Sequence, residues 1–235
     1  MPGRRVAVIT GASRGIGAGL VAGYRSKGWH VVANARVAPA SNDSRVLPIA
    51  GDVADPATAE RLVSAALDRF GRLDTLVNNA GLFVSKAFTE YTAEEYSRVV
   101  GVNLSAFFAV TQKAVIEMLQ GGRGHVVNIT STLVENADAR VPAALTALTK
   151  GGLAAATRSL AIEYASRGIR VNAVSPGVIR TSAASPAVSE ALAELHPVGR
   201  MGRVRDVVDA VLFLESAPFV SGEILHVDGG QSAGH

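Results

Sequence analysis

The stretch TGASRGIG, residues 10–17, decides the fold of this chain. It follows the apolar segment RVAVIT and precedes a helical pattern, with glycines at positions 11, 15 and 17. Gly11 permits a tight turn, Gly15 lets the backbone approach a diphosphate, and Gly17 allows the helix to pack closely on the strand. The N–H groups at the start of the helix can then bind the anion. The pattern therefore predicts a dinucleotide-binding turn, whose other candidate residues are Ser13, Arg14 and Ile16.

Short apolar segments alternate with longer helical patterns along the rest of the chain. Strands are expected at residues 5–10, 30–35, 45–50, 75–80, 125–130, 170–175 and 223–228, and helices at about 14–27, 56–70, 92–100, 103–119 and 143–166. This alternation is typical of right-handed crossovers and a parallel sheet. Segments such as VAVI and HVVNI are apolar on both faces, which suits a sheet covered on both sides. We predict one α/β domain over residues 1–235, a Rossmann-like doubly wound parallel sheet with helices on both faces.

Composition excludes several classes of function. The chain has no cysteine and five scattered histidines, so no metal site is expected. The net charge of +3 arises from 23 basic and 20 acidic residues without a basic block, which argues against nucleic-acid binding. No apolar run approaches the length that spans a membrane, and the apolar segment before Gly11 is too short for a signal peptide. A cytoplasmic protein that acts on a small molecule is expected.

Seven motifs occur in an order that resembles the short-chain dehydrogenase/reductase family. They are TGASRGIG at 10–17, GDV at 51–53, NNAG at 78–81, VNL at 102–104, VVNITS at 126–131, RVNAVSPG at 170–177 and VDGG at 227–230. The resemblance spans essentially the whole chain, and it implies a nicotinamide cofactor. It implies further that Asp52 and Val53 lie near the adenine, Asn79, Ala80 and Gly81 beside the ribose, and Pro176, Gly177 and Ile179 near the nicotinamide.

The end of the second expected strand indicates which cofactor is bound. A carboxylate at this place would bind the ribose 2′-hydroxyl of NAD. The sequence has Ala35 there, followed by Arg36, and Arg14 lies in the glycine turn. Two guanidinium groups can bind a 2′-phosphate through paired hydrogen bonds. The sequence therefore predicts NADP(H).

The same resemblance implies an active site of asparagine, serine, tyrosine and lysine. Asn103, expected at the start of a helix, Ser131 at a strand end, and Lys150 match three of these positions. The tyrosine position, one helical turn before the lysine, holds Thr146. The longer spacing of the enoyl reductase branch places Ala143 there instead. Because a general acid contributes about 10²–10⁴ in rate, simple ketones are expected to be poor substrates.

A different group must then supply the proton. The candidates are Glu135, Asp138, His196, Thr132 and water, although His196 is as well explained as a surface histidine. Two functions follow. The first is an NADPH-dependent reductase of an activated carbonyl, an imine or a conjugated compound. The second is a protein without redox activity, such as a cyclase, an isomerase or a dinucleotide-sensing subunit. The retained catalytic positions favour the reductase.

Two helical segments indicate self-association. Residues 103–120 and 142–165 are apolar around more of their circumference than a helix packed on one side requires. Each is expected to bury a second face against another subunit. We predict a homotetramer, or otherwise a homodimer.

Overall fold

Seven parallel strands form the central sheet of the computed structural model, which describes residues 4–38, 41–181 and 186–234. The strands are β1 Val6–Ile9, β2 His30–Ala35, β3 Val46–Ala50, β4 Thr75–Asn78, β5 Gly124–Ile129, β6 Ile169–Pro176 and β9 Ile224–Val227. Their order is β3-β2-β1-β4-β5-β6-β9, so the winding reverses between β1 and β4. The predicted strands and the doubly wound α/β class are confirmed. Ligands bind at such a reversal, beyond the carboxyl ends of the strands.

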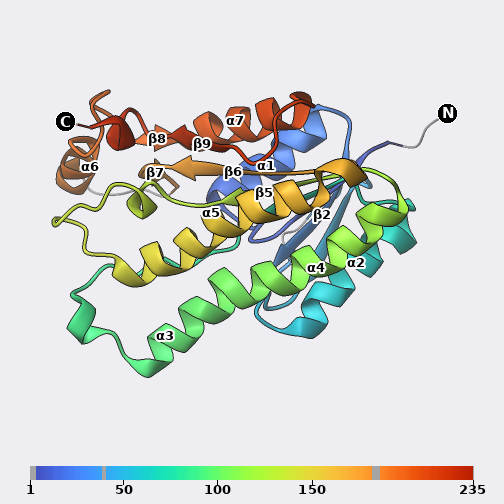
Figure 1. The fold of residues 1–235 in the computed structure, drawn as a ribbon, viewed down its shortest axis with the longest axis horizontal. Helices are drawn as coiled ribbons and strands as arrows, with labels where there is room; N and C mark the ends of the chain where they lie inside the picture. The colour runs from blue at the N-terminus through green and yellow to red at the C-terminus, as the bar shows by residue number, and fades with distance from the viewer. Residues whose placement is uncertain (1–3, 39–40, 182–185, 235) are drawn as a thin grey trace.

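Helices cover both faces of this sheet (Figure 1). Helices α1 (Gly15–Ser26) and α7 (Val204–Ser216) pack together on one face. Helices α2 (Pro56–Phe70), α4 (Ala106–Gln120) and α5 (Ala144–Tyr164) cover the other. Helix α7 was missing from our expectation, although its buried residues recur at helical spacing. They are Val207, Val208, Val211 and Leu214.

The expected break before Asn103 is wrong. Helix α3 (Ala93–Val100) continues through a π-helical turn, η2 (Gly101–Ser105), into α4 without interruption. Asn103 therefore lies inside a helix, at a π-bulge of the kind often found at functional sites. By length and composition alone, the continuous helix Ala93–Gln120 is long and apolar enough to cross a membrane. This contradicts our expectation that no apolar run approaches that length. A helix packed in a protein core can have the same length and composition, and α4 contributes buried residues to the core.

The remaining elements lie near the carboxyl edge of the sheet or in connections. Strands β7 (Ile179–Arg180) and β8 (Gly202–Arg203) form a small second sheet, and α6 spans Pro186–Ala193. The 3₁₀ turns are η1 Phe88–Glu90, η3 Thr132–Val134, η4 Ala165–Arg167 and η5 Gln231–Ala233. None of these elements was predicted. The strands β7 and β8 and the 3₁₀ turns have only two or three residues, which carry no periodicity, and α6 has only eight.

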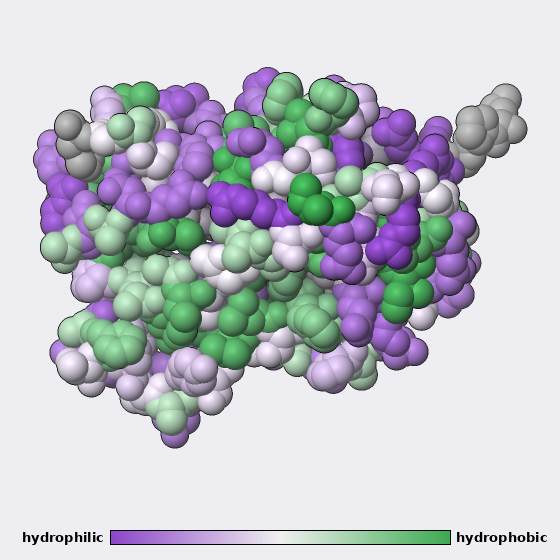
Figure 2. Space-filling model, viewed as in Figure 1, coloured by the Kyte–Doolittle hydropathy of each residue, from purple (hydrophilic) through white to green (hydrophobic). Residues whose placement is uncertain are grey.

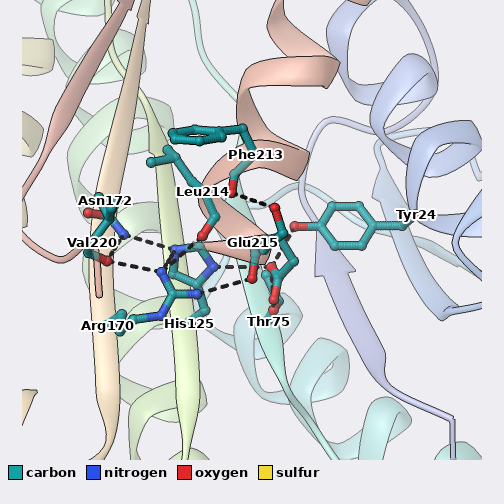
Figure 3. A network of polar contacts seen from close by, with 10 residues as sticks. Tyr24, Thr75, His125, Arg170, Asn172, Phe213, Leu214, Glu215 and Val220 are labelled. Carbon is teal, nitrogen blue, oxygen red and sulfur yellow. Dashed lines mark hydrogen bonds and ion pairs between the residues drawn. The ribbon is translucent and has the colours of Figure 1, made fainter. Parts of the chain in front are cut away.

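A buried ionic cluster joins the elements at the opposite, amino-terminal edge of the sheet (Figure 3). The Glu215 carboxylate, at the end of α7, accepts hydrogen bonds from the hydroxyls of Tyr24 at 3.1 Å and Thr75 at 2.9 Å. The same carboxylate lies 3.1 Å from Nδ1 of His125. Arg170 donates to the carbonyls of Leu214 and Val220, both at 3.0 Å. The polar groups of the cluster thus satisfy one another and fix α7 to the strands.

His125 in this cluster is neutral. Its Nε2 accepts a hydrogen bond from the Asn172 amide at 3.1 Å, so the ring proton lies on Nδ1 and points to Glu215. Burial lowers the pKa of His125, and the nearby Arg170 guanidinium acts in the same direction, whereas Glu215 opposes it. A second ring proton would face the donors of Asn172 and Arg170. The folded cluster therefore disfavours protonation of His125.

We expect His125 to make folding sensitive to acid. Because its folded-state pKa lies below the unfolded value of about 6.5, the unfolded chain binds a proton that the folded chain does not. Stability is therefore retained above pH 6.5 and falls below it, by at most about 1.4 kcal/mol per pH unit from this group. Urea unfolding between pH 7.5 and 5.5 measures this loss, which should be smaller in His125→Gln. An equal loss in both proteins would contradict the assignment.

Candidate functional site

The glycine turn that follows β1 has the geometry expected of a dinucleotide site. Gly11 and Gly15 have φ angles of +65° and +52°, values that side chains strongly disfavour. A Cβ at Gly17 would lie 2.1 Å from the Gly11 carbonyl oxygen, so only glycine permits this approach of helix to turn. Arg14, the residue that precedes α1, places no side-chain cap on the helix N-terminus. The first amides of α1 are therefore available to an anion.

A cavity of about 320 Å³ opens over this turn. Its lining contains most of the predicted cofactor residues, namely Gly11, Ser13, Arg14, Gly15, Ile16, Gly17, Arg36, Asp52, Val53, Asn79, Ala80 and Gly81. These residues come from the ends of β1, β2, β3 and β4, which the winding brings to one edge. Sequence reasoning missed several lining residues, among them Arg98 and Thr181. Arg98 lies one turn before Val102 on the same helical run, and Val102 lines the cavity as well.

The cavity carries an excess of positive charge. Arg14, Arg36 and Arg98 line it, and Asp52 is the acidic residue among its lining side chains. The Asp52 carboxylate accepts a hydrogen bond from the amide of Ala54 at 2.9 Å. Within the described ranges, neither Arg14 nor Arg36 forms an ion pair. A ligand with a further phosphate besides the diphosphate fits these unpaired guanidinium groups.

Asn79 holds the glycine turn in place. Its side-chain amide donates to the carbonyls of Thr10 at 2.9 Å and Gly11 at 3.0 Å. The Thr10 hydroxyl in turn accepts from the amides of Asn79 and Ala80, both at 3.0 Å. The side chain of Asn79 and the amides of Asn79 and Ala80 thus hold the 79–81 segment against the glycine turn, where it lines the cavity.

Lys150 lies buried beside this cavity. It is 7% exposed, and its Nζ donates to the carbonyl of Ile129, at the end of β5, over 2.6 Å. A Cβ at Gly81 would lie 3.0 Å from the same Nζ, so the ammonium contacts the backbone of a residue that lines the cavity. Burial lowers the pKa of Lys150 to about 8. A lysine lying over apolar surface with its head in water does not have this environment.

Asn103 links three segments around Lys150. Its Oδ1 accepts from the amide of Leu82 at 2.8 Å, and its Nδ2 donates to the carbonyl of Leu82 at 3.1 Å. Nδ2 also donates to the Thr149 hydroxyl at 3.0 Å. The π-turn thus directs Asn103 toward both the 81–82 segment and α5, at the residue next to Lys150.

Ser131 and Thr146 differ in their hydrogen bonding. The Ser131 hydroxyl, half-buried at the end of β5, accepts from the amide of Leu133 at 3.3 Å and begins η3. Thr146 lies one turn before Lys150 on α5 and is 3% exposed. Its hydroxyl has no hydrogen-bond partner in the part of the chain that the structure describes. A buried hydroxyl without a partner calls for an explanation, since it costs about 1–3 kcal/mol.

Two of the alternative proton donors are engaged in ion pairs. Glu135 lies 2.5 Å from Nε2 of His226, which projects from β9. Asp138 forms an ion pair with Arg140, at 2.6 Å between Oδ2 and the guanidinium. Both carboxylates are thus held by neighbours on the 131–143 connection and β9.

The other two alternative donors are buried and bonded. The surface explanation of His196 is wrong, because the ring is 3% exposed. Its Nε2 accepts from the amide of Val178 at 2.9 Å, and its Nδ1 donates to the carbonyl of Leu192 at 3.0 Å. The Thr132 hydroxyl donates to the Asp228 carboxylate at 3.3 Å. Each of these two side chains therefore already donates its polar hydrogen to another group of the protein.

Three predicted residues lie at or just after the end of β6, outside the lining of the cavity. Pro176 ends the strand, and the amide of Gly177 donates to the Val227 carbonyl at 3.2 Å. A Cβ at Gly177 would lie 2.7 Å from Nε2 of His196, so glycine is required there. Ile179 begins β7, two residues before Thr181, which does line the cavity.

A larger cavity, of about 860 Å³, lies at the amino-terminal edge of the sheet. It is lined in part by the cluster of Figure 3, including His125, Arg170 and Glu215. The polar groups of that cluster are bonded to one another, and the carboxyl ends of the strands are remote. The smaller cavity over the glycine turn therefore remains the candidate site. Within the described residues, no group of acidic and histidine side chains suits a metal ion.

The fold and the charged cavity over its glycine turn define a dinucleotide-binding protein of the doubly wound α/β class. The family model described as enoyl-(acyl carrier protein) reductase matches residues 11–232. A cis-4-hydroxycyclohexanecarboxylate dehydrogenase of Sinomonas cyclohexanicum is 38% identical over 243 residues, which cover 97% of each chain. The chain belongs to the short-chain dehydrogenase/reductase family.

Solved structures agree with this assignment. ElxO with NADP bound has a TM-score of 0.92 at 26% identity, covering 98% of this chain and 100% of that one. A 3-ketoacyl-(acyl-carrier-protein) reductase from Brucella melitensis, complexed with NADH, has a TM-score of 0.89 at 32% identity, covering 97% of this chain and 98% of that one. Both solved relatives hold a nicotinamide dinucleotide, and this protein is an oxidoreductase of their family.

Proposed function

We propose that the protein is an NADPH-dependent reductase of an activated small-molecule substrate, an imine, an activated carbonyl or a conjugated compound. The observation that carries this proposal is the buried Lys150 ammonium, held against Gly81 at the cavity, with Thr146 one turn earlier. NADPH, when bound, supplies the hydride. The hydroxyl of Thr146 is shorter and less acidic than the tyrosine hydroxyl expected at this position. It therefore favours substrates that need less help from a general acid.

Each polar residue of the site has a distinct role in this proposal. The turn residues 11–17 and Arg36 would bind the phosphates of the cofactor, and residues 79–81, which line the same cavity, would contact it as well. Lys150 would donate hydrogen bonds to the nicotinamide ribose. Ser131 donates a hydrogen bond to the substrate oxygen. Asn103 holds the 81–82 segment next to α5 through its hydrogen bonds to Leu82 and Thr149, and so positions Lys150.

Turnover with a panel of substrates tests the proposal. The purified protein with NADPH should reduce a cyclic iminium ion or an activated ketone at least about 100-fold faster than a simple ketone, because a positioned acid contributes about 10²–10⁴ in rate. NADPH oxidation and product formation are measured together. If NADPH binds but no compound of these classes is reduced, the proposed class of substrate is wrong.

Arg14 and Arg36 are expected to determine the preference for NADPH over NADH. Each hydrogen bond to a charged group contributes about 1.5–3 kcal/mol, so Arg36→Ala should weaken NADPH binding about 10–100-fold and leave NADH binding nearly unchanged. Calorimetric titration of both cofactors measures the difference. Arg158→Ala, on α5 and outside the lining of the cavity, is the matched control. Equal affinities of the parent protein for NADPH and NADH would refute the assignment.

We propose a homotetramer built on the outer surfaces of α4 and α5. Phe108 and Ile116 on α4 are 64% and 49% exposed, and Leu148 and Ile162 on α5 are 60% and 83% exposed. Figure 2 shows hydrophobic surface gathered over these two helices. Contiguous apolar surface of this kind marks an interface.

We also propose that the protein is located in the cytoplasm, where an enzyme of this kind would meet its small-molecule substrate.

Light scattering at micromolar concentration should give a tetrameric or dimeric mass. Ile162→Glu would place a charge in the proposed interface and should lower this mass, while the exposed substitution Arg205→Glu on α7 should not. A monomeric mass of the parent protein would exclude the proposed assembly.

A further inference from the structure

A second group of basic side chains gathers at the amino-terminal edge of the sheet, opposite the edge that carries the cofactor cavity. Arg4 precedes β1, His30 begins β2, and Arg45 precedes β3. In the register of the sheet, His30 lies beside Val6 of β1 and is level with Arg45. Side chains at the same level, or two residues apart, on parallel strands point to the same face. The three basic side chains therefore share one face of the sheet.

Helix α2, which covers this face, adds a fourth basic side chain. Arg69 lies in the last turn of α2, and its guanidinium is 5.7 Å from the centre of the Phe70 ring. The His30 ring stacks on the same phenyl ring, with centroids 4.4 Å apart. Burial lowers the pKa of His30. Three positive charges lower it further, those of Arg4, Arg45 and Arg69. The guanidinium groups therefore converge around a neutral imidazole.

Acidic side chains balance this charge only in part. Asp43 forms ion pairs with Arg45, at 3.1 Å, and with Arg25 of α1. Among the residues that the structure describes, neither Arg4 nor Arg69 forms an ion pair. Like charges that face one another on neighbouring strands destabilise a sheet. The cluster thus keeps two unpaired guanidinium groups whose repulsion an anion would relieve.

The spacing of these arginines suits a ligand with more than one phosphate. Arginine binds phosphate oxygens through paired hydrogen bonds, which lysine cannot form. Neighbouring strands lie about 4.8 Å apart, so Arg4 before β1 and Arg45 before β3 are separated by at least roughly 10 Å at the backbone. Long side chains that start so far apart can contact different parts of an extended anion. The stacked rings of His30 and Phe70 between the strands and α2 add no charge of their own.

We propose that Arg4, Arg45 and Arg69 form a second anion-binding site, which takes a small ligand with two or more linked phosphate groups. The site lies at the opposite edge of the sheet from the cavity over the glycine turn, and it does not depend on the proposed reductase function. A bound anion offsets the three positive charges around His30 and favours its protonated form. The pKa of His30 should therefore rise when the ligand binds, and this signal is specific to the site.

Titration with inorganic pyrophosphate at low ionic strength, followed through the NMR signal of the His30 ring, tests the proposal. The signal is assigned by its loss in His30→Gln, and in the parent it should shift to saturation. Arg69→Gln should weaken pyrophosphate binding about 10-fold, because a hydrogen bond to a charged group is lost. Arg167→Gln is the matched control, since the Arg167 guanidinium also lies over an aromatic ring, 4.3 Å from the centre of Tyr164, but in η4. This variant should stay within about 2-fold of the parent.

Three results would overturn the proposal. The first is a His30 signal that does not reach saturation with pyrophosphate. The second is an equal loss of affinity in Arg69→Gln and Arg167→Gln. The third is tighter binding of a single-stranded oligonucleotide than of pyrophosphate at the same signal, which would indicate a contact with nucleic acid. None of these measurements uses turnover, so failure of the protein to reduce any substrate would leave their meaning unchanged.

Discussion

Replacement of Lys150 by methionine is expected to abolish reduction of carbonyl substrates and, at the same time, to stabilise the protein without cofactor. Methionine preserves much of the apolar stem and removes the charge. A pKa lowered from 10.5 to about 8 corresponds to about 3 kcal/mol of unfavourable burial at neutral pH. The hydrogen bond to Ile129 is lost in the variant, so the gain in unfolding free energy should be smaller than this value.

The pH dependence of this gain follows from the direction of the pKa shift. Between about pH 8 and 10.5 the unfolded chain binds a proton at Lys150 that the folded chain has released, so the stability of the parent rises with pH in this window. The advantage of Lys150→Met should therefore be largest below pH 8 and should shrink toward pH 10.5. Urea unfolding at pH 7 and pH 10 measures it.

Binding and turnover decide whether Lys150 acts on the cofactor. Both Lys150→Met and Lys150→Ala should weaken NADPH binding about 10-fold or more, the size expected for loss of a charged hydrogen bond. Lys150→Ala also creates a cavity and should be less stable than Lys150→Met. Unchanged NADPH affinity and unchanged turnover in both variants would show that Lys150 merely packs against its surroundings.

Thr146→Tyr is expected to create reduction of simple ketones that the parent performs poorly. A tyrosine there would place a phenol one turn before Lys150, on the same face of α5, and the lysine charge would lower the pKa of the phenol. The rate should rise by about 10²–10⁴, which is the contribution of a positioned general acid. Initial rates with a series of unactivated ketones measure the gain.

Thr146→Phe is the matched control for this substitution. It adds the same ring to a position that is 3% exposed, and therefore the same steric demand, but no hydroxyl. The phenylalanine variant should show no gain on simple ketones. If the parent already reduces such ketones rapidly, or if both aromatic variants gain equally, the role assigned to position 146 is wrong.

The sequence alone determined the fold and most of the cofactor cavity. The seven strands and their alternation with helices are local patterns of apolar residues, so they could be predicted without knowledge of distant contacts. The glycines of TGASRGIG are required by backbone geometry within one turn. Arg14 and Arg36 were found because a parallel sheet brings the ends of β1 and β2 to one edge. Arg98 was missed because its helix reaches that edge through packing, which the sequence pattern does not reveal.

Only the tertiary structure decided the chemistry available around Lys150. The sequence left open Glu135, Asp138, His196 and Thr132, since their types permit proton transfer. Their hydrogen bonds to β9, to neighbours on the 131–143 connection and to the segments at 178 and 192 commit each of them elsewhere. The sequence pattern likewise does not reveal the π-turn that orients Asn103, or that the Thr146 hydroxyl has no partner among the residues that the structure describes. Periodicity fixes which residues form an element, whereas hydrogen-bond partners across the sheet depend on how distant elements pack.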